Sequence, residues 1–467
     1  MGSAAVDPAW HAAVLEHVEH GRLGDAAVAC EAVLAVTPDD WLALRLLGLV
    51  RHRQGALEPA SQLLLQALRA APPDTVQIVA LLNELADTLR ARLDFDTALE
   101  CYRQALAQKP DDAATLRNFA DMMVSLNRHG EALALYRAAR AVTPEAADLQ
   151  VDEAMTMLTL GMWLEAWGRF ESRLSLPPPY AAPGFPADVP HWRGHTDIAG
   201  KTILLHAEQG LGDTLQFVRY VAMVAERGAH IVLRVQPVLR KLLAGLPGVG
   251  SVIGVHDPVP PVDLQCPLMS LPYAFGTTLE NVPARIPYLR AAPEYLMVWR
   301  ALLGLPRKRR VGLVWTGRPV PAHRSMPLAT FAPLLARPDL EVHVLQPQMS
   351  ETERAWLAAH GSGVVDHSPD LRDFADTAAL VSCMDLIVTI DTSVAHLAGA
   401  LGVPVWIILP FSADWRWLAG RSDTPWYPTA RLFRQTRPRH WESAVAQVMQ
   451  ALSEWTEADQ RPPGLPT

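Results

Sequence analysis

Residues 201–214 read KTILLHAEQGLGDT, a short apolar run that leads into a turn with two glycines and an acid. The run KTILLH has the pattern of a buried strand. Gly210 and Gly212 permit a tight turn and let a ligand approach the backbone. Asp213 then falls near the start of the next predicted helix. The stretch therefore predicts a strand, a turn and a helix with a candidate ligand site at the turn.

The same alternation continues toward the C-terminus. HIVLRV and a weaker VDLQC read as strands, separated by the helical stretches TLQFVRYVAMVAERG and PVLRKLLAGL. From residue 311 the pattern restarts, with the strand candidates VGLVW, EVHVL, GVVD, LIVTI and VPVWIIL. Such alternation is typical of parallel sheets flanked by helices. We expect two Rossmann-like α/β halves, residues 201–290 and 291–455, a C-terminal tail at 456–467, and ligands at the carboxyl ends of the strands in a cleft between the halves.

The N-terminal part of the chain is built differently. Prolines recur there about every 34 residues, a period that belongs to paired-helix repeats. Small residues recur where two helices must approach closely, and large residues follow four positions later. The small positions are Ala26, Ala60, Ala98, Ala132 and Ala166, and the large ones are Cys30, Leu64, Tyr102, Tyr136 and Phe170.

Turns between the paired helices carry Gly21, Gly55 and Gly161, where a left-handed residue would end the first helix. Leu93 and Asn127 stand at the corresponding turns of the third and fourth units. The pattern resembles the tetratricopeptide repeat family, with about five helix pairs over residues 1–180, followed by a proline-rich linker at 181–200. The resemblance implies a concave surface for a protein or peptide; a dimerisation arm or a purely structural arm is the alternative.

Composition limits the partners. The net charge is −8 and the pI is about 6.1, so no global attraction to nucleic acid or to an anionic membrane is expected. The basic cluster RKRR at 307–310 reads as a solvated loop. Four widely separated cysteines indicate a reduced, metal-free cytoplasmic protein. No apolar run reaches the ~18 residues of a membrane span.

A second candidate site follows the predicted strand LIVTI. Asp391, Thr392 and Ser393 lead into a helix start, where backbone amides and hydroxyls would form an anion site suited to nucleotide-sugar phosphates. His396, near the first turn of that helix, could add a donor or a positive charge. The alternatives are an N-cap that serves only the fold and a histidine that packs between helices.

A third stretch, VWTGRPVPAHRSMPL, also leaves a strand through a turn. Trp315 could stack on a ligand or pack, and Gly317 would permit close approach. Arg318, His323 and Arg324 are candidates to neutralise a diphosphate, with one arginine favoured over all three, or else a solvated loop. Gln346 could bond a nucleotide base. Among the aromatic and basic residues 415–427, packing is favoured for most, and Arg416 is a candidate phosphate partner.

Together, QGLGD at 209–213 and DTSVAHLAGALGVPVW at 391–406 resemble glycosyltransferase family 9, the heptosyltransferase-like enzymes. With the repeats, the whole chain is similar to bacterial tetratricopeptide-containing glycosyltransferases. The resemblance implies an N-terminal solenoid followed by a GT-B type pair of Rossmann-like domains, no metal or other cofactor, Asp213 as general base and a diphosphate loop at Asp391, Thr392, Ser393 and His396. Ser393 and Val394 depart from the usual heptosyltransferase residues, which leaves the donor class open.

These observations predict transfer of a sugar from a nucleotide-sugar donor to a hydroxyl of a protein recruited by the repeats, such as flagellin or another surface protein. A lipid or saccharide acceptor, with the arm used for oligomerisation, is one alternative. A non-catalytic nucleotide-sugar-binding scaffold is the other. No nucleic-acid partner and no membrane span are expected, and homo-oligomers remain open.

Overall fold

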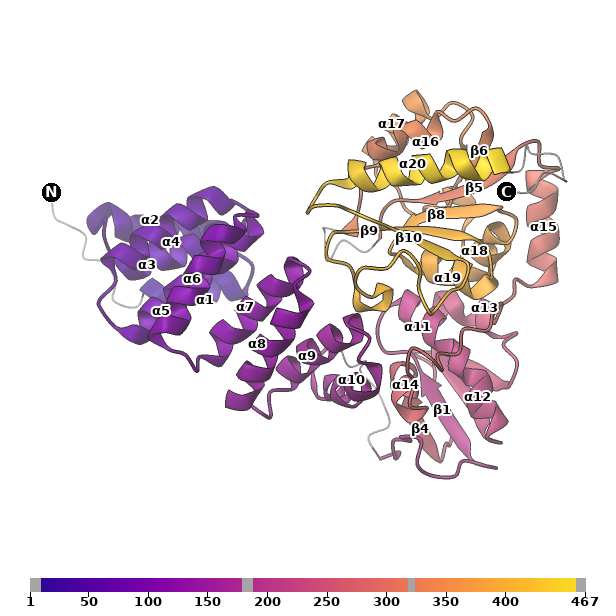
Figure 1. The fold of residues 1–467 in the computed structure, drawn as a ribbon, viewed down its shortest axis with the longest axis horizontal. Helices are drawn as coiled ribbons and strands as arrows, with labels where there is room; N and C mark the ends of the chain where they lie inside the picture. The colour runs from indigo at the N-terminus through magenta and orange to yellow at the C-terminus, as the bar shows by residue number, and fades with distance from the viewer. Residues whose placement is uncertain (1–9, 179–187, 318–323, 459–467) are drawn as a thin grey trace. The chain divides into compact units, whose positions relative to one another are not determined.

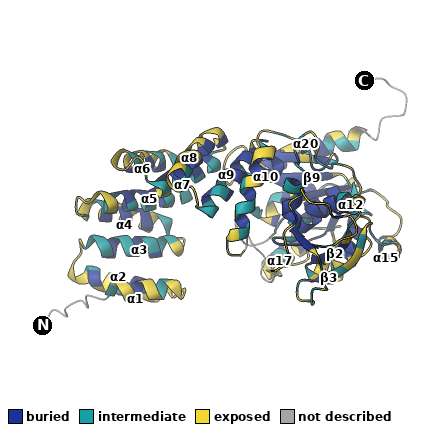
Figure 2. Ribbon diagram, turned by 90° about the horizontal axis from the view of Figure 1, so that it is seen from below, coloured by how far each residue is buried: buried dark blue, intermediate teal, exposed yellow. Residues whose placement is uncertain are grey.

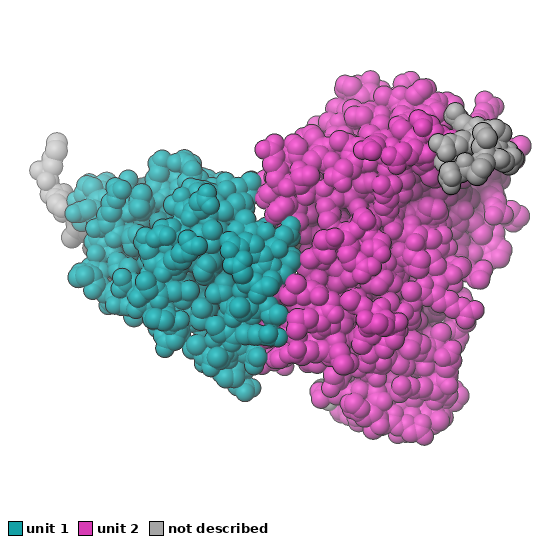
Figure 3. Space-filling view, in the orientation of Figure 1, with its two compact units in different colours: residues 1–149 teal, residues 150–467 magenta. Residues whose placement is uncertain are grey.

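The computed structural model describes residues 10–178, 188–317 and 324–458. The chain divides into two compact units, Met1–Leu149 and Gln150–Thr467, coloured separately in Figure 3. No helix among the described residues is long and apolar enough to cross a bilayer. All four cysteines are free thiols.

The first unit is a succession of antiparallel helix pairs (Figure 1). Four aspartates open helices here: Asp40, Asp74, Asp94 and Asp112 each accept a hydrogen bond from a backbone N–H of the first turn. The helices are α1 (Trp10–Glu19), α2 (Leu23–Val36), α3 (Trp41–Arg53), α4 (Leu57–Ala70), α5 (Thr75–Ala91), α6 (Phe95–Gln108), α7 (Ala113–Ser125) and α8 (His129–Val142). A further pair, α9 (Ala147–Thr159) and α10 (Trp163–Phe170), continues the pattern.

The predicted turn and packing positions are confirmed. Gly21, Gly55 and Gly161 have φ values of 72°, 78° and 81°. Leu93 and Asn127, which replace glycine, take the same left-handed conformation with φ values of 69° and 58°. The five small residues of the period, Ala26, Ala60, Ala98, Ala132 and Ala166, are all fully buried. The repeat therefore sets both the turn and the close approach of each helix pair.

The first α/β half of the second unit holds a four-stranded parallel sheet in the order β3-β2-β1-β4. The strands are β1 (Thr202–His206), β2 (His230–Val235), β3 (Val249–Gly254) and β4 (Leu264–Pro267). The connecting helices are α11 (Leu211–Phe217), η2 (Val218–Tyr220), α12 (Val221–Glu226), η3 (Pro237–Leu239), α13 (Arg240–Leu243), η4 (Leu268–Ser270) and α14 (Leu271–Ala274).

The second half holds a six-stranded parallel sheet in the order β10-β9-β8-β5-β6-β7. Read from β5 outward, this is the doubly wound order of a Rossmann fold. The strands are β5 (Arg309–Val314), β6 (Leu340–Val344), β7 (Val365–Asp366), β8 (Leu386–Ile390), β9 (Val405–Leu409) and β10 (Ala430–Arg434). The helices are α15 (Pro293–Leu303), η6 (Leu328–Phe331), α16 (Ala332–Leu335), α17 (Glu351–His360), η7 (Ser368–Asp370), α18 (Phe374–Val381), α19 (Ser393–Leu401), η8 (Trp415–Trp417) and α20 (Trp441–Ala458).

The structure thus confirms the predicted fold class, a helical solenoid followed by two parallel α/β halves. The central strands are buried along their length and the outer faces of the helices are exposed (Figure 2). Strands β3 and β10 and helices α15 and α20 were not predicted. Strand β3 lies at a sheet edge with an exposed, glycine-containing start, and so lacks the apolar run by which the other strands were found.

The last helix pair packs against the α/β halves rather than ending the first unit. Trp163 of α10 stacks on Trp426 with ring centroids 4.8 Å apart, and the indole N–H of Trp167 donates to the carbonyl of Thr277. Arg173, fully buried, forms an ion pair with Glu208 in the first half, with 2.9 Å between Nη2 and Oε1. These contacts explain why the boundary between the two compact units falls after Leu149, well before residue 180, the predicted end of the repeats.

Candidate functional site

Two helix starts meet where the sheets of the two halves end. Strand β1 leads through Gly210 into α11, and β8 leads through Thr392 into α19, and these two helices pack together (Figure 1). A Cβ atom placed on Gly212 would lie 2.7 Å from Cδ2 of His396. Gly212 is therefore required for the contact between α11 and α19, whereas the sequence had suggested close approach of a ligand.

Asp213 makes two different contacts. Its Oδ2 accepts a hydrogen bond of 2.7 Å from the backbone N–H of Gly210, a capping contact at the start of α11. Its Oδ1 accepts from Nη2 of Arg416 in the second half. The side chain keeps 18% of its surface exposed. The carboxylate is therefore oriented from two sides and still reachable.

Arg416 joins the two halves. Its guanidinium pairs with Asp414, with 2.8 Å between Nη1 and Oδ1, and donates through Nε to Oε1 of Gln216 at 3.0 Å. It also lies over the ring of Trp415 at 4.3 Å. The sequence suggested that Arg416 would pair with a phosphate. In the structure its donors are directed at carboxylates and an amide instead.

Asp391 is buried at the end of β8, beside Arg324. The Nε of Arg324 lies 4.0 Å from Oδ2 of Asp391, and its Nη2 donates to the Asp391 carbonyl at 3.4 Å. Burial, reinforced by the negative charge of Asp414, raises the pKa of Asp391 to about 6. Arg324 keeps about a third of its side chain exposed, so it remains available to an anionic ligand.

Within the part of the chain that the structure describes, no side chain caps the start of α19. Thr392 occupies the N-cap position with extended backbone, and its hydroxyl lies 3.0 Å from that of Thr389. The interpretation of Thr392 as a capping residue is therefore wrong for its side chain. Ser393 begins the helix and is half-buried. The first turn of this nine-residue helix therefore directs backbone amides and a partial positive charge toward this edge of the sheet.

His396 is a packing residue, and the expectation that it could carry a positive charge is wrong. Its ring stacks on Trp417 with centroids 5.3 Å apart, and its Nδ1 lies 2.9 Å from the hydroxyl of Tyr427. Burial and then the charge of Arg416 lower its pKa to about 3. The ring is therefore neutral at physiological pH.

The remaining predicted residues support the loop after β5. Trp315 is buried in the core and donates to Glu353 at 2.6 Å, so it packs rather than stacking on a ligand. The Oε1 of Gln346 accepts from the backbone N–H of Thr316 at 3.2 Å. Gly317 lies close to the start of α19, since a Cβ atom there would be 3.4 Å from Cγ2 of Thr392. Arg318 and His323 lie outside the described residues.

Two residues that contact Arg416, Gln216 and Asp414, were not predicted from the sequence as site residues. Gln216 is fully buried, and its Nε2 has no hydrogen-bond partner within the described ranges. Burial alone would raise the pKa of Asp414, but the charge of Arg416 and its hydrogen bonds to this carboxylate hold the pKa below the ordinary value. Gln216 follows Asp213 by three residues on α11, and Asp414 precedes Arg416 by two. Their spacing from predicted site residues was the available signal.

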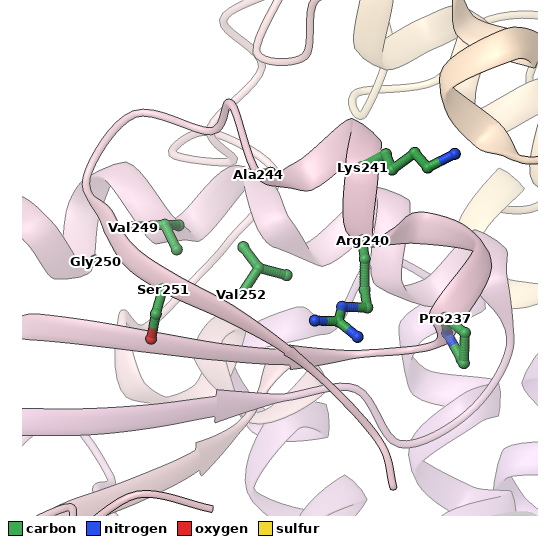
Figure 4. Close-up of a pocket in the computed structure, with 8 residues that line it drawn as sticks. All are labelled: Pro237, Arg240, Lys241, Ala244, Val249, Gly250, Ser251 and Val252. Atoms are coloured by element: carbon green, nitrogen blue, oxygen red, sulfur yellow. The ribbon is translucent and has the colours of Figure 1, made fainter. Parts of the chain in front are cut away.

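Two surface pockets lie away from this cluster. One, of about 600 Å³, is formed by α13 and the edge strand β3 (Figure 4). In it Arg240 lies beside the strand, while Lys241 points away and pairs with Asp373 of the second half at 2.7 Å. The other, of about 460 Å³, is lined by residues around Arg300 and Cys383. Among the described residues no group of three or more His, Cys, Asp or Glu side chains could hold a metal ion.

Comparison with known families identifies the repeats. Residues 11–75 and 77–145 each match the family Tetratricopeptide repeat. These two matches confirm the predicted solenoid over the first unit.

The whole chain also resembles a curated protein, Protein FlbA of Caulobacter vibrioides, at 26% identity over 96% of this chain and 84% of that protein. Two solved structures are similar to 56% of the chain. One is the glycosyl transferase family 9 protein from Veillonella parvula DSM 2008, at 12% identity, TM-score 0.41 and 91% coverage of that chain. The other is the E. coli ADP-heptose lps heptosyltransferase II, at 15% identity, TM-score 0.42 and 100% coverage.

Proposed function

We propose that this chain is a glycosyltransferase that moves a sugar from a nucleotide-sugar donor to a hydroxyl of an acceptor recruited by the repeats. One observation carries the proposal. Asp213 near the start of α11 and the start of α19 after β8 meet at the carboxyl ends of two parallel sheets, where α11 packs against α19. Open α/β sheets bind nucleotide ligands at that edge.

The donor diphosphate would lie at the start of α19. The amides that follow Thr392 and Ser393 provide hydrogen-bond donors, and the helix dipole favours an anion there. Arg324, partly exposed beside Asp391, would neutralise the diphosphate as it leaves. Gly317 lies beside Thr392, and Gln346 and Trp315 act by holding the backbone that leads from β5 to Gly317.

Asp213 would act as the general base. The acceptor oxygen attacks the anomeric carbon while Asp213 takes its proton. The bond from that carbon to the diphosphate oxygen breaks, and the nucleoside diphosphate leaves with the electron pair. The N–H of Gly210 and the guanidinium of Arg416 hold the carboxylate in one orientation, which lowers the entropic part of the barrier. Neutral His396 fixes α11 against α19.

In this proposal Arg324 and the start of α19 provide the positive charge that stabilises the leaving diphosphate, a role that a metal ion has in other transferases. Transfer should therefore persist in a chelator. The acceptor would be a protein, such as flagellin or another surface protein, since the confirmed repeats form a surface of the kind that binds protein segments. A lipid or saccharide acceptor, with the arm used for association of copies, is the competing assignment.

A first experiment tests donor binding. Thermal melts would be recorded with UDP-, GDP-, ADP-, CMP- and dTDP-sugars on the full chain and on Arg324→Ala. A donor present at 100 times its Kd should stabilise the native chain by about 2.7 kcal/mol. We expect one nucleotide class to stabilise the parent and to lose at least about tenfold in affinity on Arg324→Ala. Stabilisation by none of the five would overturn the donor site.

A second experiment tests chemistry. Radiolabelled donor of the class found above would be incubated with the parent, with Asp213→Asn and with a lysate that contains candidate acceptors, with and without EDTA. We expect label in protein for the parent in both buffers and a rate lower by about 10²-fold or more for Asp213→Asn. Donor binding without any transfer would instead favour the scaffold.

A further inference from the structure

Helix α15 exposes an apolar face that no other described element covers. Met297 is 69% exposed, Val298 61% and Leu302 60%, and Leu305, just after the helix, is 91% exposed. We call these four residues the apolar patch. Val298 and Leu302, four residues apart, share one face of the helix, while Met297 precedes them and Leu305 follows the end of the helix. The opposite face is packed: Trp299 is 2% exposed and meets the ring of His367 edge-on.

Basic residues border the apolar patch. Arg300 on α15 and Arg307 and Lys308 in the connection to β5 are all exposed, and the stretch from 293 to 310 contains a single acid, Glu294. Arg300 also lines the pocket of about 460 Å³ beside Leu305. This concentration of positive charge stands out in a chain whose net charge is −8. The cluster RKRR, expected to be a solvated loop, therefore adjoins an exposed apolar surface.

We propose that the apolar patch and its basic border bind the surface of an anionic lipid bilayer. An apolar helix face inserts at the boundary of headgroups and acyl chains, and neighbouring Arg and Lys attract anionic lipids. An eleven-residue helix is too short to span the membrane, so the chain lies on the surface.

Charge favours a bilayer over a second copy of the chain. In a two-fold dimer formed through this patch, the same surface faces itself. Arg300, Arg307 and Lys308 would then approach the same residues of the other copy, which is unfavourable. An anionic bilayer complements both the apolar and the basic residues.

The position of the patch leaves the candidate site free. Lys308 immediately precedes β5, which starts at Arg309, so the basic border lies at the amino ends of the strands of the second sheet. Asp391 and the start of α19 lie at the carboxyl ends of the same sheet. A bound membrane would therefore hold the protein without covering the candidate site.

The test is flotation of the full chain with vesicles of phosphatidylcholine alone and with 30% phosphatidylglycerol. We expect binding only to the anionic vesicles. Val298→Ser/Leu305→Ser and Arg307→Glu/Lys308→Glu should each weaken it by at least about tenfold, because each removes one of the two contributions. Matched changes at exposed positions of the repeats, Val76→Ser/Leu164→Ser and Arg69→Glu/Arg103→Glu, should have no effect.

Three results would overturn the proposal. The first is no binding to either vesicle. The second is equal loss in the matched controls, which would indicate non-specific adsorption. The third is concentration-dependent dimerisation in light scattering, abolished by Val298→Ser/Leu305→Ser and accompanied by no vesicle binding, which would assign the patch to a second copy. Melting temperatures of all variants would show that loss of binding is not loss of folding.

Discussion

Arg416 of the second α/β half donates a hydrogen bond to Asp213 of the first, across 203 residues of chain. The same guanidinium contacts Asp414 and Gln216, so one buried cation orders three polar side chains. The proposed base in the first half is therefore held by a cation that belongs to the second half.

Removing the guanidinium of Arg416 should lower the free energy of unfolding. Arg416→Ala leaves two carboxylates without their partner, and loss of one member of a buried pair typically costs 3–5 kcal/mol. Arg416→Lys should recover part of this, because lysine keeps the charge but not the forked donors. Urea unfolding measures both. Arg421→Ala is the matched control, since its pair with Asp423 is exposed and should contribute less than about 1 kcal/mol. Equal losses for Arg416→Ala and Arg421→Ala would contradict the assignment.

Replacing Asp391 should change how stability depends on pH. Its pKa is raised from 3.8 to about 6, so folding favours the protonated acid. That contribution is present below about pH 4 and is lost as pH rises to about 6. His396 acts in the opposite direction: its pKa is lowered from 6.5 to about 3, and its contribution is present above about pH 6.5 and lost as pH falls.

The two effects oppose each other in the parent. Asp391→Asn removes the first, so the melting temperature of the variant should rise more steeply between about pH 4 and pH 6 than that of the parent. Calorimetry across this range tests it. Parallel curves would show that Asp391 does not titrate there.

Adding one methyl group at Gly212 should separate the helix starts. A Cβ atom there would lie 2.7 Å from His396, and such overpacking typically costs 1–3 kcal/mol. Gly130→Ala is a closely matched control, because Gly130 is also the second residue of a helix and has open space around it. The control should be neutral or stabilising by up to about 1 kcal/mol. Chemical denaturation of the two variants gives the comparison, and a Gly212→Ala protein as stable as the parent would refute the close contact.

Glycine at a turn that lacks it should stabilise the repeats. Leu93 has a φ of 69°, a conformation that costs a leucine about 1 kcal/mol or more. Leu93→Gly should therefore raise the midpoint of unfolding of the repeats. Gly55→Ala, at the equivalent turn with a φ of 78°, should lower it. A shift of the same sign in both variants would not fit the observed backbone.

Local patterns in the sequence predicted most of the fold. Strands β1, β8 and β9 are almost wholly buried, and their continuous apolar runs show it. Edge strand β3 is exposed at several positions and was missed. The repeat period even located Leu93 and Asn127 at the left-handed turns. Such features depend on neighbours along the chain.

The candidate site was only partly predictable. Asp213 was placed correctly near the start of a helix and Asp391 at the end of a strand, because a strand–turn–helix motif is local. The partner of Asp213 could not be found, since it depends on how two separate halves pack. The charge of His396 depends on burial by Trp417 and Tyr427, which are distant in sequence. The exposure of one face of α15 could likewise not be predicted, because the apolar composition of this helix resembles that of a core helix.

The stack of Trp163 on Trp426 bears on how the protein can be divided. A fragment that begins at residue 181 would lose α10 and leave Trp426 and Trp415 uncovered. It would also leave the buried Glu208 without its partner Arg173. Newly exposed indoles and an unpaired buried acid are conditions under which a truncated protein aggregates. Cutting before α9, near residue 147, keeps these contacts intact. The helix pair α9 and α10 thus packs as part of the α/β core. A truncated protein that contains this core should therefore also contain these two helices.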